Sequence, residues 1–263
     1  MRIKLVCILL LLSFFSLPAQ EVFQLAPPLM KYASGFFKNK MEMELRFAQA
    51  GSSVFYTLNG EEPTENDLLY KHPILISDKS VTLKAKSFGK SFFPSETISA
   101  TFIKQGIDIT GVVSTDADKP YTANGSESLT DNIGGFADIN KNSWLGYKSD
   151  SIKIELKLKK RKKVSEVLIN FLQSEGSWIF LPEEIRVSFY DKKQKQFMLL
   201  GNKLNSFSEQ HPGSHSVHQI IDSKNKIKTD RIVIDIRPLN KIPDWHPGKG
   251  NHGWCFIDEI KIY

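Results

Sequence analysis

The sequence predicts an all-β chain folded into two β-sandwiches. Short runs alternate apolar and polar residues, which is typical of strands with one buried face; the clearest are 43–47, 81–85, 152–158 and 232–236. Turn-forming pairs such as Asn59-Gly60 and Pro247-Gly248 separate the runs. No stretch beyond the first twenty residues keeps a helical apolar period. Many short strands at regular spacing indicate sandwiches rather than a helical or mixed fold.

The N-terminus has the layout of a secretory signal peptide, which we place at residues 1–19. Arg2 and Lys4 precede an apolar run from Leu5 to Leu17, and Pro18 and Ala19 follow it. The run is short for a membrane span, so we expect none once the signal is removed. We expect a secreted, periplasmic or cell-surface protein of a bacterium.

Composition excludes some partners. Loss of Arg2 and Lys4 reduces the 35 basic residues to 33, against 29 acidic ones, so the mature charge is 33 − 29 = +4. That charge is too small to indicate nucleic-acid binding. Cleavage also removes Cys7 and leaves Cys255 as the only cysteine, so stability must come from packed cores.

A change in composition divides the mature chain at about residues 103–107. All four tryptophans lie downstream of it, in a unit of 107–263, whereas the unit of 26–103 has none. The two units differ enough in composition for us to expect two separate domains.

The first unit contains a pattern that is fairly specific. Residues 54–64 read VFYTLNGEEPT, followed by Tyr70 and by the strand VTLKAK at 81–86. This pattern resembles the fibronectin type III-like domain at the C-terminal side of chitobiases and bacterial β-hexosaminidases, with Asn59 where the family usually has Asp. Apolar alternation and a tight turn explain the pattern structurally, so we expect a spacer or packing partner here and no catalytic group.

The second unit carries several ordered motifs: LTDNI at 129–133, WLGY at 144–147, FLQ at 171–173, WIFLPEEI at 178–185 and PDWHPGKGNHGWCFIDEI at 243–260. Together they resemble the discoidin-like, galactose-binding-like jelly-roll sandwich of the coagulation factor type C superfamily, as appended to bacterial family 20 β-hexosaminidases. The resemblance implies glycan binding and one structural calcium ion. It implies Asp131 and Glu259 as calcium ligands, since carboxylates suit a hard cation.

Tryptophans on loops with polar neighbours suit a sugar, because its C–H face packs on an aromatic ring and its hydroxyls need hydrogen bonds. The candidate ligand-binding residues are Trp245, His246, Asn251, His252, Trp178 and Gln173. The alternative is that the large rings plug the ends of the sandwich. Trp144 and Trp254 fit that structural role better.

Two other clusters have a simple interpretation and a functional one. His211, His215 and His218 could be presented to a metal, but the segment is rich in Ser, Gly and Pro, which favours a solvated loop. The basic run 157–163 is most simply a solvated hairpin tip, and binding of an acidic glycan or lipopolysaccharide is the functional alternative.

We expect no catalytic residues. Glycoside hydrolysis usually needs two carboxyl groups facing one bond, and the adjacent Asp258 and Glu259 should point to opposite faces of an extended segment. No nucleophile elbow, phosphate loop or zinc-protease motif is present. The sequence therefore predicts an exported, non-catalytic carbohydrate-binding accessory protein for hexosamine- or galactose-type glycans. The alternative is a docking module for a separate glycosidase or surface complex.

Overall fold

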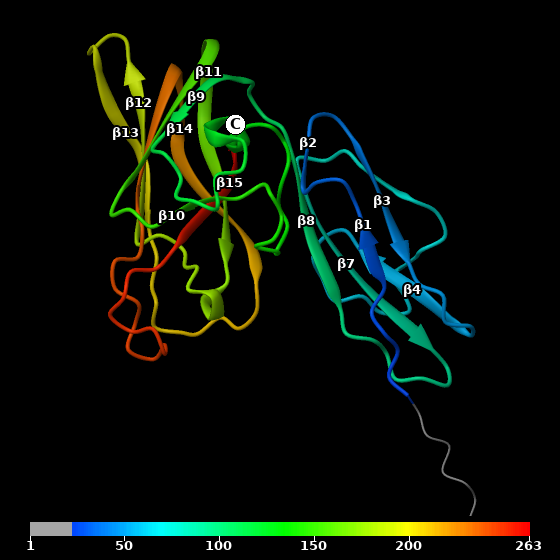
Figure 1. Ribbon diagram of the computed structural model, residues 1–263. Helices are drawn as coiled ribbons and strands as arrows, with labels where there is room; N and C mark the ends of the chain where they lie inside the picture. The colour runs from blue at the N-terminus through cyan, green and yellow to red at the C-terminus, as the bar shows by residue number, and fades with distance from the viewer. Residues whose placement is uncertain (1–22) are drawn as a thin grey trace, which may run out of the picture.

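A computed structural model describes residues 23–263 of the chain (Figure 1). The predicted signal peptide at 1–19 lies outside these residues. Regular structure is almost entirely β-strand, with two short 3-10 helices, η1 (Gly125–Leu129) and η2 (Glu175–Ser177). The prediction of an all-β chain of β-sandwiches is confirmed. Within 23–263, no helix has the length and apolar character needed to cross a membrane.

The N-terminal sandwich consists of β1 to β8 in two sheets. One sheet has the order β1-β3-β6 and the other β2-β8-β7-β4-β5. The strands are β1 (Leu29–Lys31), β2 (Phe36–Phe37), β3 (Met41–Arg46), β4 (Ser52–Thr57), β5 (Leu68–Leu69), β6 (Ile74–Ile76), β7 (Ser80–Gly89) and β8 (Ile98–Lys104). Every second residue of β7 is buried, including Leu83 and Ala85, so the alternation seen in the sequence does bury one face.

The predicted tight turn of the N-terminal sandwich follows β4. Gly60 has φ of +81°, which favours glycine, and the Asn59 side chain accepts a hydrogen bond from the Glu61 amide at 3.1 Å. Thr57 donates to the Glu61 carbonyl across the same turn. These contacts are local, and they support a structural role for the motif.

The C-terminal sandwich consists of β9 to β15. Its strands are β9 (Ile109–Ser114), β10 (Leu145–Tyr147), β11 (Ile152–Gln173), β12 (Glu184–Asp191), β13 (Gln196–Leu204), β14 (His215–Arg237) and β15 (Cys255–Ile262). β11 and β14 run through both layers. Residues 152–157 of β11 pair with 231–236 of β14, and there β9 lies beside β11 and β12 beside β14. Residues 166–173 of β11 pair with 215–222 of β14, and there β15 lies beside β11. Irregular register between these halves lets the strands change layer.

The core of the C-terminal sandwich is large and continuous, with buried aliphatic residues from both layers, such as Ile154, Ile169 and Ile234. Cys255 is buried in it, and burial raises the pKa of its thiol, so it is an inert core residue. Trp144 is also buried, and its Nε1 donates to the Asp138 carbonyl at 3.1 Å. Both residues serve packing.

The two sandwiches touch along a seam that is part apolar and part backbone. Phe36 and Ile103 of the N-terminal sandwich pack with Leu168 and the partly buried Tyr263. Beside them, the Gly35 amide donates to the Gly134 carbonyl at 2.8 Å. In Figure 1, β2 and β8 accordingly lie on the side of the N-terminal sandwich that faces the C-terminal one.

Gly134 is required at the seam by space as well as by backbone geometry. A Cβ at this position would lie 2.2 Å from Asp258 Oδ2, and φ is +148°. Its neighbour Gly135 has φ of +75°, and a Cβ there would lie 3.1 Å from the Gly35 Cα. Only glycines allow the two backbones to approach this closely.

Gly134→Ala should therefore destabilise the chain by about 1–3 kcal/mol, because the added methyl must displace the Asp258 carboxyl or the loop. Urea unfolding measures the change. Gly176→Ala is the control, since nothing lies within 4 Å of a Cβ there and we expect no loss of stability. Equal stability of Gly134→Ala and wild type would contradict the close approach.

His218 lies at the same seam, and its protonation is affected by burial there. Its ring meets the Phe36 ring edge-on, with 5.9 Å between centroids, and its Nε2 is buried without a hydrogen-bond partner. Burial lowers the pKa of His218 from 6.5 to about 4. The folded chain therefore holds this imidazole neutral under conditions where the unfolded chain protonates it.

This pKa difference predicts acid sensitivity. As pH falls from 6.5 to about 4, the unfolded state binds a proton that the folded state refuses, so up to about 3 kcal/mol of stability is lost. Unfolding free energies of wild type and His218→Gln across this range isolate the contribution by difference. A difference that does not vary with pH would show that His218 titrates normally.

Candidate functional site

The turn after β11 presents Trp178 at one end of the C-terminal sandwich. η2 follows β11, and Trp178 closes it in the left-handed conformation with φ of +64°. The Trp178 amide donates to the Glu175 carbonyl at 2.8 Å, and Ser174 bridges Ile179 across the turn. This backbone leaves the Trp178 side chain 37% exposed, more than any other tryptophan of the chain.

A second loop, Pro243–Gly253, supports the exposed indole. Gly248 lies against the ring, since a Cβ there would be 2.8 Å from both Cε2 and Cζ2. The His246 ring meets the indole edge-on at 6.2 Å, and it also contacts Phe180 and Trp245 edge-on at 5.5 and 5.6 Å. Trp178 is therefore held by packing and offers a fixed aromatic surface.

His246 joins the two loops from inside. It is only 5% exposed. Its Nδ1 accepts from the Gly248 amide at 2.9 Å, which leaves the proton on Nε2 to donate to the Glu175 carbonyl at 3.0 Å. With both nitrogens engaged, His246 positions the loops and does not reach solvent.

Glu175 is a second internal anchor, 3% exposed. One oxygen accepts from Gln173 Nε2 at 2.9 Å and lies 3.1 Å from His211 Nδ1, and the other accepts from the His211 amide at 2.8 Å. The predicted ligand residue Gln173 is thus buried and engaged. His211, which the sequence placed in a solvated loop, is instead fixed beside the Trp178 turn with its side chain about half exposed.

The remaining predicted ligand residues differ in exposure. Trp245 is partly buried, and its Nε1 donates to the Phe207 carbonyl at 2.8 Å. His252 is partly buried, with Nε2 3.4 Å from Asp150 and Nδ1 2.7 Å from the Gly253 carbonyl. Asn251 is exposed, and its amide nitrogen donates to the Gly248 carbonyl. The structure thus brings an exposed indole together with Asn251 and His211.

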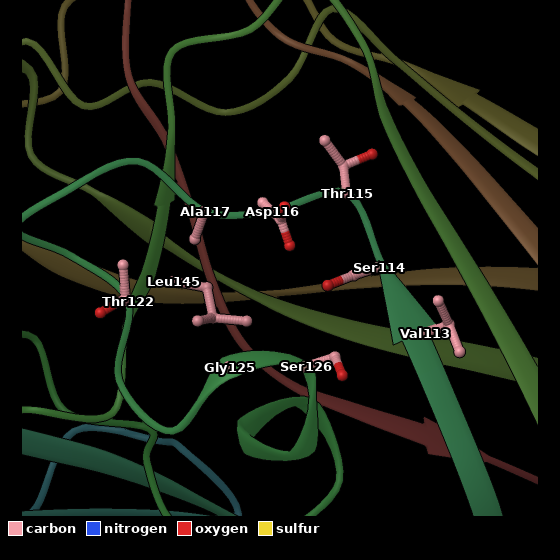
Figure 2. A pocket seen from close by; sticks show the side chains of 9 residues that line it. All are labelled: Val113, Ser114, Thr115, Asp116, Ala117, Thr122, Gly125, Ser126 and Leu145. Carbon is pink, nitrogen blue, oxygen red and sulfur yellow. The ribbon is translucent and has the colours of Figure 1, made fainter.

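A separate cavity of about 390 Å³ lies between β9, η1 and β10 (Figure 2). Small and hydroxyl side chains line it, and Asp116 is its only titratable side chain. The lining of the cavity contains no second carboxyl group. The cavity therefore does not contain the pair of carboxyl groups that glycoside hydrolysis usually requires.

The acidic residues of β15 form a buried polar cluster with the loop 131–135. Asp258 accepts from Asn170 Nδ2 at 2.6 Å and from the Gly135 amide at 2.8 Å. Glu259 Oε2 accepts from the Asn132 amide at 2.7 Å, and its Oε1 lies 3.0 Å from Lys261 Nζ. The Lys261 ammonium also donates to the Asn132 side chain at 2.7 Å.

The expectation that Asp258 and Glu259 point to opposite faces was wrong. Asn170 pairs with Glu259 and the next residue, Phe171, pairs with Ile257, so Asp258 is the extra residue of a β-bulge. A bulge breaks strict alternation. Both carboxyl groups therefore bond to the same loop, at Gly135 and Asn132.

Burial dominates the electrostatics of this cluster. It raises the pKa of Asp258 well above its ordinary value and that of Glu259 to about 7, although Lys261 pulls the latter down. Burial also lowers the pKa of Lys261, and the Glu259 charge opposes that shift. Glu259 and Lys261 thus stabilise each other's charged forms, while the loss of solvation opposes both charges.

The predicted calcium ligands, Asp131 and Glu259, already have partners within the protein. Both Glu259 oxygens are engaged, and Asp131 Oδ1 accepts from the Ile133 amide at 2.7 Å. Across residues 23–263, no three or more His, Cys, Asp or Glu side chains gather in a way that could hold a metal ion. As arranged, the donor set does not fit calcium, because Lys261 already supplies the positive charge. Calcium stays a prediction from the resemblance.

Comparison with known proteins identifies the first unit. Residues 32–101 match the family model of the chitobiase/beta-hexosaminidase C-terminal domain. Over the matched residues, the N-terminal sandwich is therefore similar to that domain family. The match falls within the stretch where the sequence pattern resembled that family. No curated protein matches the chain.

Solved structures similar to the chain are distant. A family 32 carbohydrate-binding module from Streptococcus pneumoniae EndoD is 11% identical, with a TM-score of 0.38, covering 60% of this chain and 96% of the module. A GH31 CBM32-2 module bound to GalNAc is 13% identical, with a TM-score of 0.37, covering 59% and 98%. A Ruminococcus gnavus GH29 fucosidase is 12% identical at 0.35, covering 58% of this chain and 24% of the fucosidase. Each TM-score lies below 0.5, so we infer the function from the site itself.

The N-terminal sandwich contacts the C-terminal sandwich with its strand ends. Lys79 Nζ lies 2.9 Å from Glu166 Oε2 and 4.0 Å from the centre of the Tyr263 ring, while the Tyr263 hydroxyl donates to the Lys104 carbonyl. Burial raises the pKa of that hydroxyl. These contacts make the domain a packing partner for the sandwich that carries Trp178.

Lys261→Met should cost about 3–5 kcal/mol of unfolding free energy, because it leaves Glu259 buried without its counter-charge. The loss should grow as pH rises above about 7, because the folded wild type ionises Glu259 there beside Lys261, whereas the variant resists that ionisation. Lys261→Met/Glu259→Gln should recover part of the stability. A single variant as stable as wild type at pH 8 would contradict the pairing.

EDTA provides a second test of the same cluster. Because Lys261 supplies the cation, we expect the thermal midpoint of the wild-type chain to stay unchanged when EDTA is added. A midpoint that falls in EDTA and recovers with added calcium would establish the calcium site implied by the resemblance.

Proposed function

We propose that the chain is a non-catalytic carbohydrate-binding protein whose C-terminal sandwich holds a sugar on the Trp178 ring. The observation that carries the proposal is the indole itself, exposed at a loop end and fixed from below by Gly248 and His246. An exposed aromatic ring that packing holds in one orientation can stack against the apolar face of a pyranose.

Polar groups beside the ring suit the hydroxyls of the sugar. His211 is fixed by Glu175 and partly exposed, and Asn251 and Lys249 are exposed on the supporting loop. Together they offer an imidazole, an amide and an ammonium on the segments that hold the Trp178 turn. A shallow site of this kind binds in roughly the mM to μM range, or about 4–8 kcal/mol.

For the glycan we propose hexosamine- or galactose-type sugars. The family that matches the N-terminal sandwich is named after chitobiase and beta-hexosaminidase, which act on hexosamine glycans. This name supports the first class. The second class follows from the galactose-binding-like resemblance of residues 107–263. We further propose that the protein is exported by a bacterium, given the expected signal peptide, and that it assists separate glycan-degrading enzymes.

A docking role is the second candidate, and an exposed strand favours it. β13 is an edge strand that pairs only with β12 in the described sheet. It exposes Phe197, Leu199 and Leu204. An apolar edge strand is an unusual solvent-facing feature in a protein that acts alone, and a separate glycosidase or surface protein could cover it.

Glycan-array binding distinguishes the two. Trp178→Ala should lower sugar affinity at least tenfold because it removes the stacking surface, and Trp178→Phe should retain part of the affinity. Phe197→Ala removes a somewhat more exposed aromatic residue from β13 and should leave sugar binding unchanged.

Two results would reject the sugar site at Trp178. One is full binding by Trp178→Ala, and the other is the absence of binding to any glycan by the wild type. If the wild type instead captures a purified glycosidase and Phe197→Ala fails to do so, the docking role is supported.

A further inference from the structure

A cavity of about 710 Å³ lies where the two sandwiches meet, away from Trp178. The linker residues 105–108 and the start of β9 form one wall. Lys38 of the N-terminal sandwich and Lys159, Lys160 and Lys162 of β11 also line it. We call this cavity the basic groove. Two domains thus contribute ammonium groups to one space.

A bend in β11 places these lysines at the groove. The pairing of β11 with β14 is interrupted between Lys157 and Lys162, so residues 159 and 160 are released from the ladder. Leu158 remains buried in the core and anchors the bend, while Lys159 and Lys160 are exposed. The irregular register is thus what turns a basic run into one wall of a cavity.

The lysines of the groove have no acidic partner in the described part of the chain. None of Lys38, Lys159, Lys160 and Lys162 takes part in an ion pair there. Next to them, Lys163 lies opposite Lys228 and Lys157 lies opposite Arg231 in the ladder. Positive charge therefore extends from the groove along the neighbouring ladder.

The acidic side chains of the groove are already engaged. Asp108 accepts from Gln105 Nε2, and Asp131 accepts from the Ile133 amide. Four lysines against two aspartates leave the lining with a charge of 4 − 2 = +2. Thr110, Thr130 and Asn132 add hydroxyl and amide groups to the same walls.

We propose that the basic groove binds an acidic polysaccharide, through carboxylate or sulfate groups on the lysines and sugar hydroxyls on the threonines and the amide. Ammonium groups on flexible stems act as point charges that suit anions spaced along a polymer. The cavity accommodates saccharide units, and its polar walls suit their hydroxyls. This site is separate from the Trp178 ring and does not depend on it.

Binding of oligogalacturonate, measured by titration calorimetry on the whole chain at 50 mM salt, tests the proposal. Lys159→Gln/Lys160→Gln should weaken binding at least tenfold, and Lys38→Gln should weaken it several-fold, because the second domain shares the groove. The control is Lys192→Gln/Lys193→Gln, which removes the same charge from exposed positions between β12 and β13 and should leave affinity unchanged. Raising the salt to 500 mM should abolish binding.

Three outcomes would overturn the proposal. They are no binding by the wild type at 50 mM salt, equal losses in the groove and control variants, and tighter binding to vesicles with anionic headgroups or to a single-stranded oligonucleotide than to the uronate polymer. Thermal midpoints of all variants within about 2 °C of wild type would show that losses come from the groove and not from unfolding. Trp178→Ala should leave uronate binding unchanged, which separates this site from the sugar site at Trp178.

Discussion

The arrangement of the chain depends on two carboxyl groups that β15 carries into a dry interior. Asp258 and Glu259 are fully buried, and a buried charge without partners costs several kcal/mol. The partners here are the amides of Asn132 and Gly135 and the Lys261 ammonium, and their bonds fix the loop 131–135. Because Gly134 of this loop bonds to Gly35, the position of the N-terminal sandwich follows from the same cluster.

Local patterns predicted the strands well, because burial of one face imposes a period of two on the sequence itself. The strands at 41–46 and 80–89 show this directly. The layer change of β11 and β14 was not predicted, since it depends on which residue each strand meets across the ladder. The bulge at Asp258 has the same cause, and it reversed the expected direction of one carboxyl group. Register is a property of pairs of strands.

The site shows a similar division between what is local and what is not. The sequence located aromatic and polar residues on two loops, but it could not say which would hold the loops together. His246 and Gln173 are engaged internally, whereas Trp178 is raised by its left-handed backbone. His211 is tied to Glu175 across 36 residues, and no short-range signal indicates such a contact. Segments that meet only in the fold decide the roles of these side chains.

β11 links features that were described separately. Its bend at 158–162 lines the basic groove, and its end at Gln173 leads into the turn that carries Trp178. At ~3.3 Å per residue, the eleven steps from Lys162 to Gln173 place these sites at most roughly 35 Å apart along the strand. A polymer long enough to reach both would be gripped bivalently, and its second attachment would be intramolecular. The two proposed sites together therefore predict avidity for long chains over short ones.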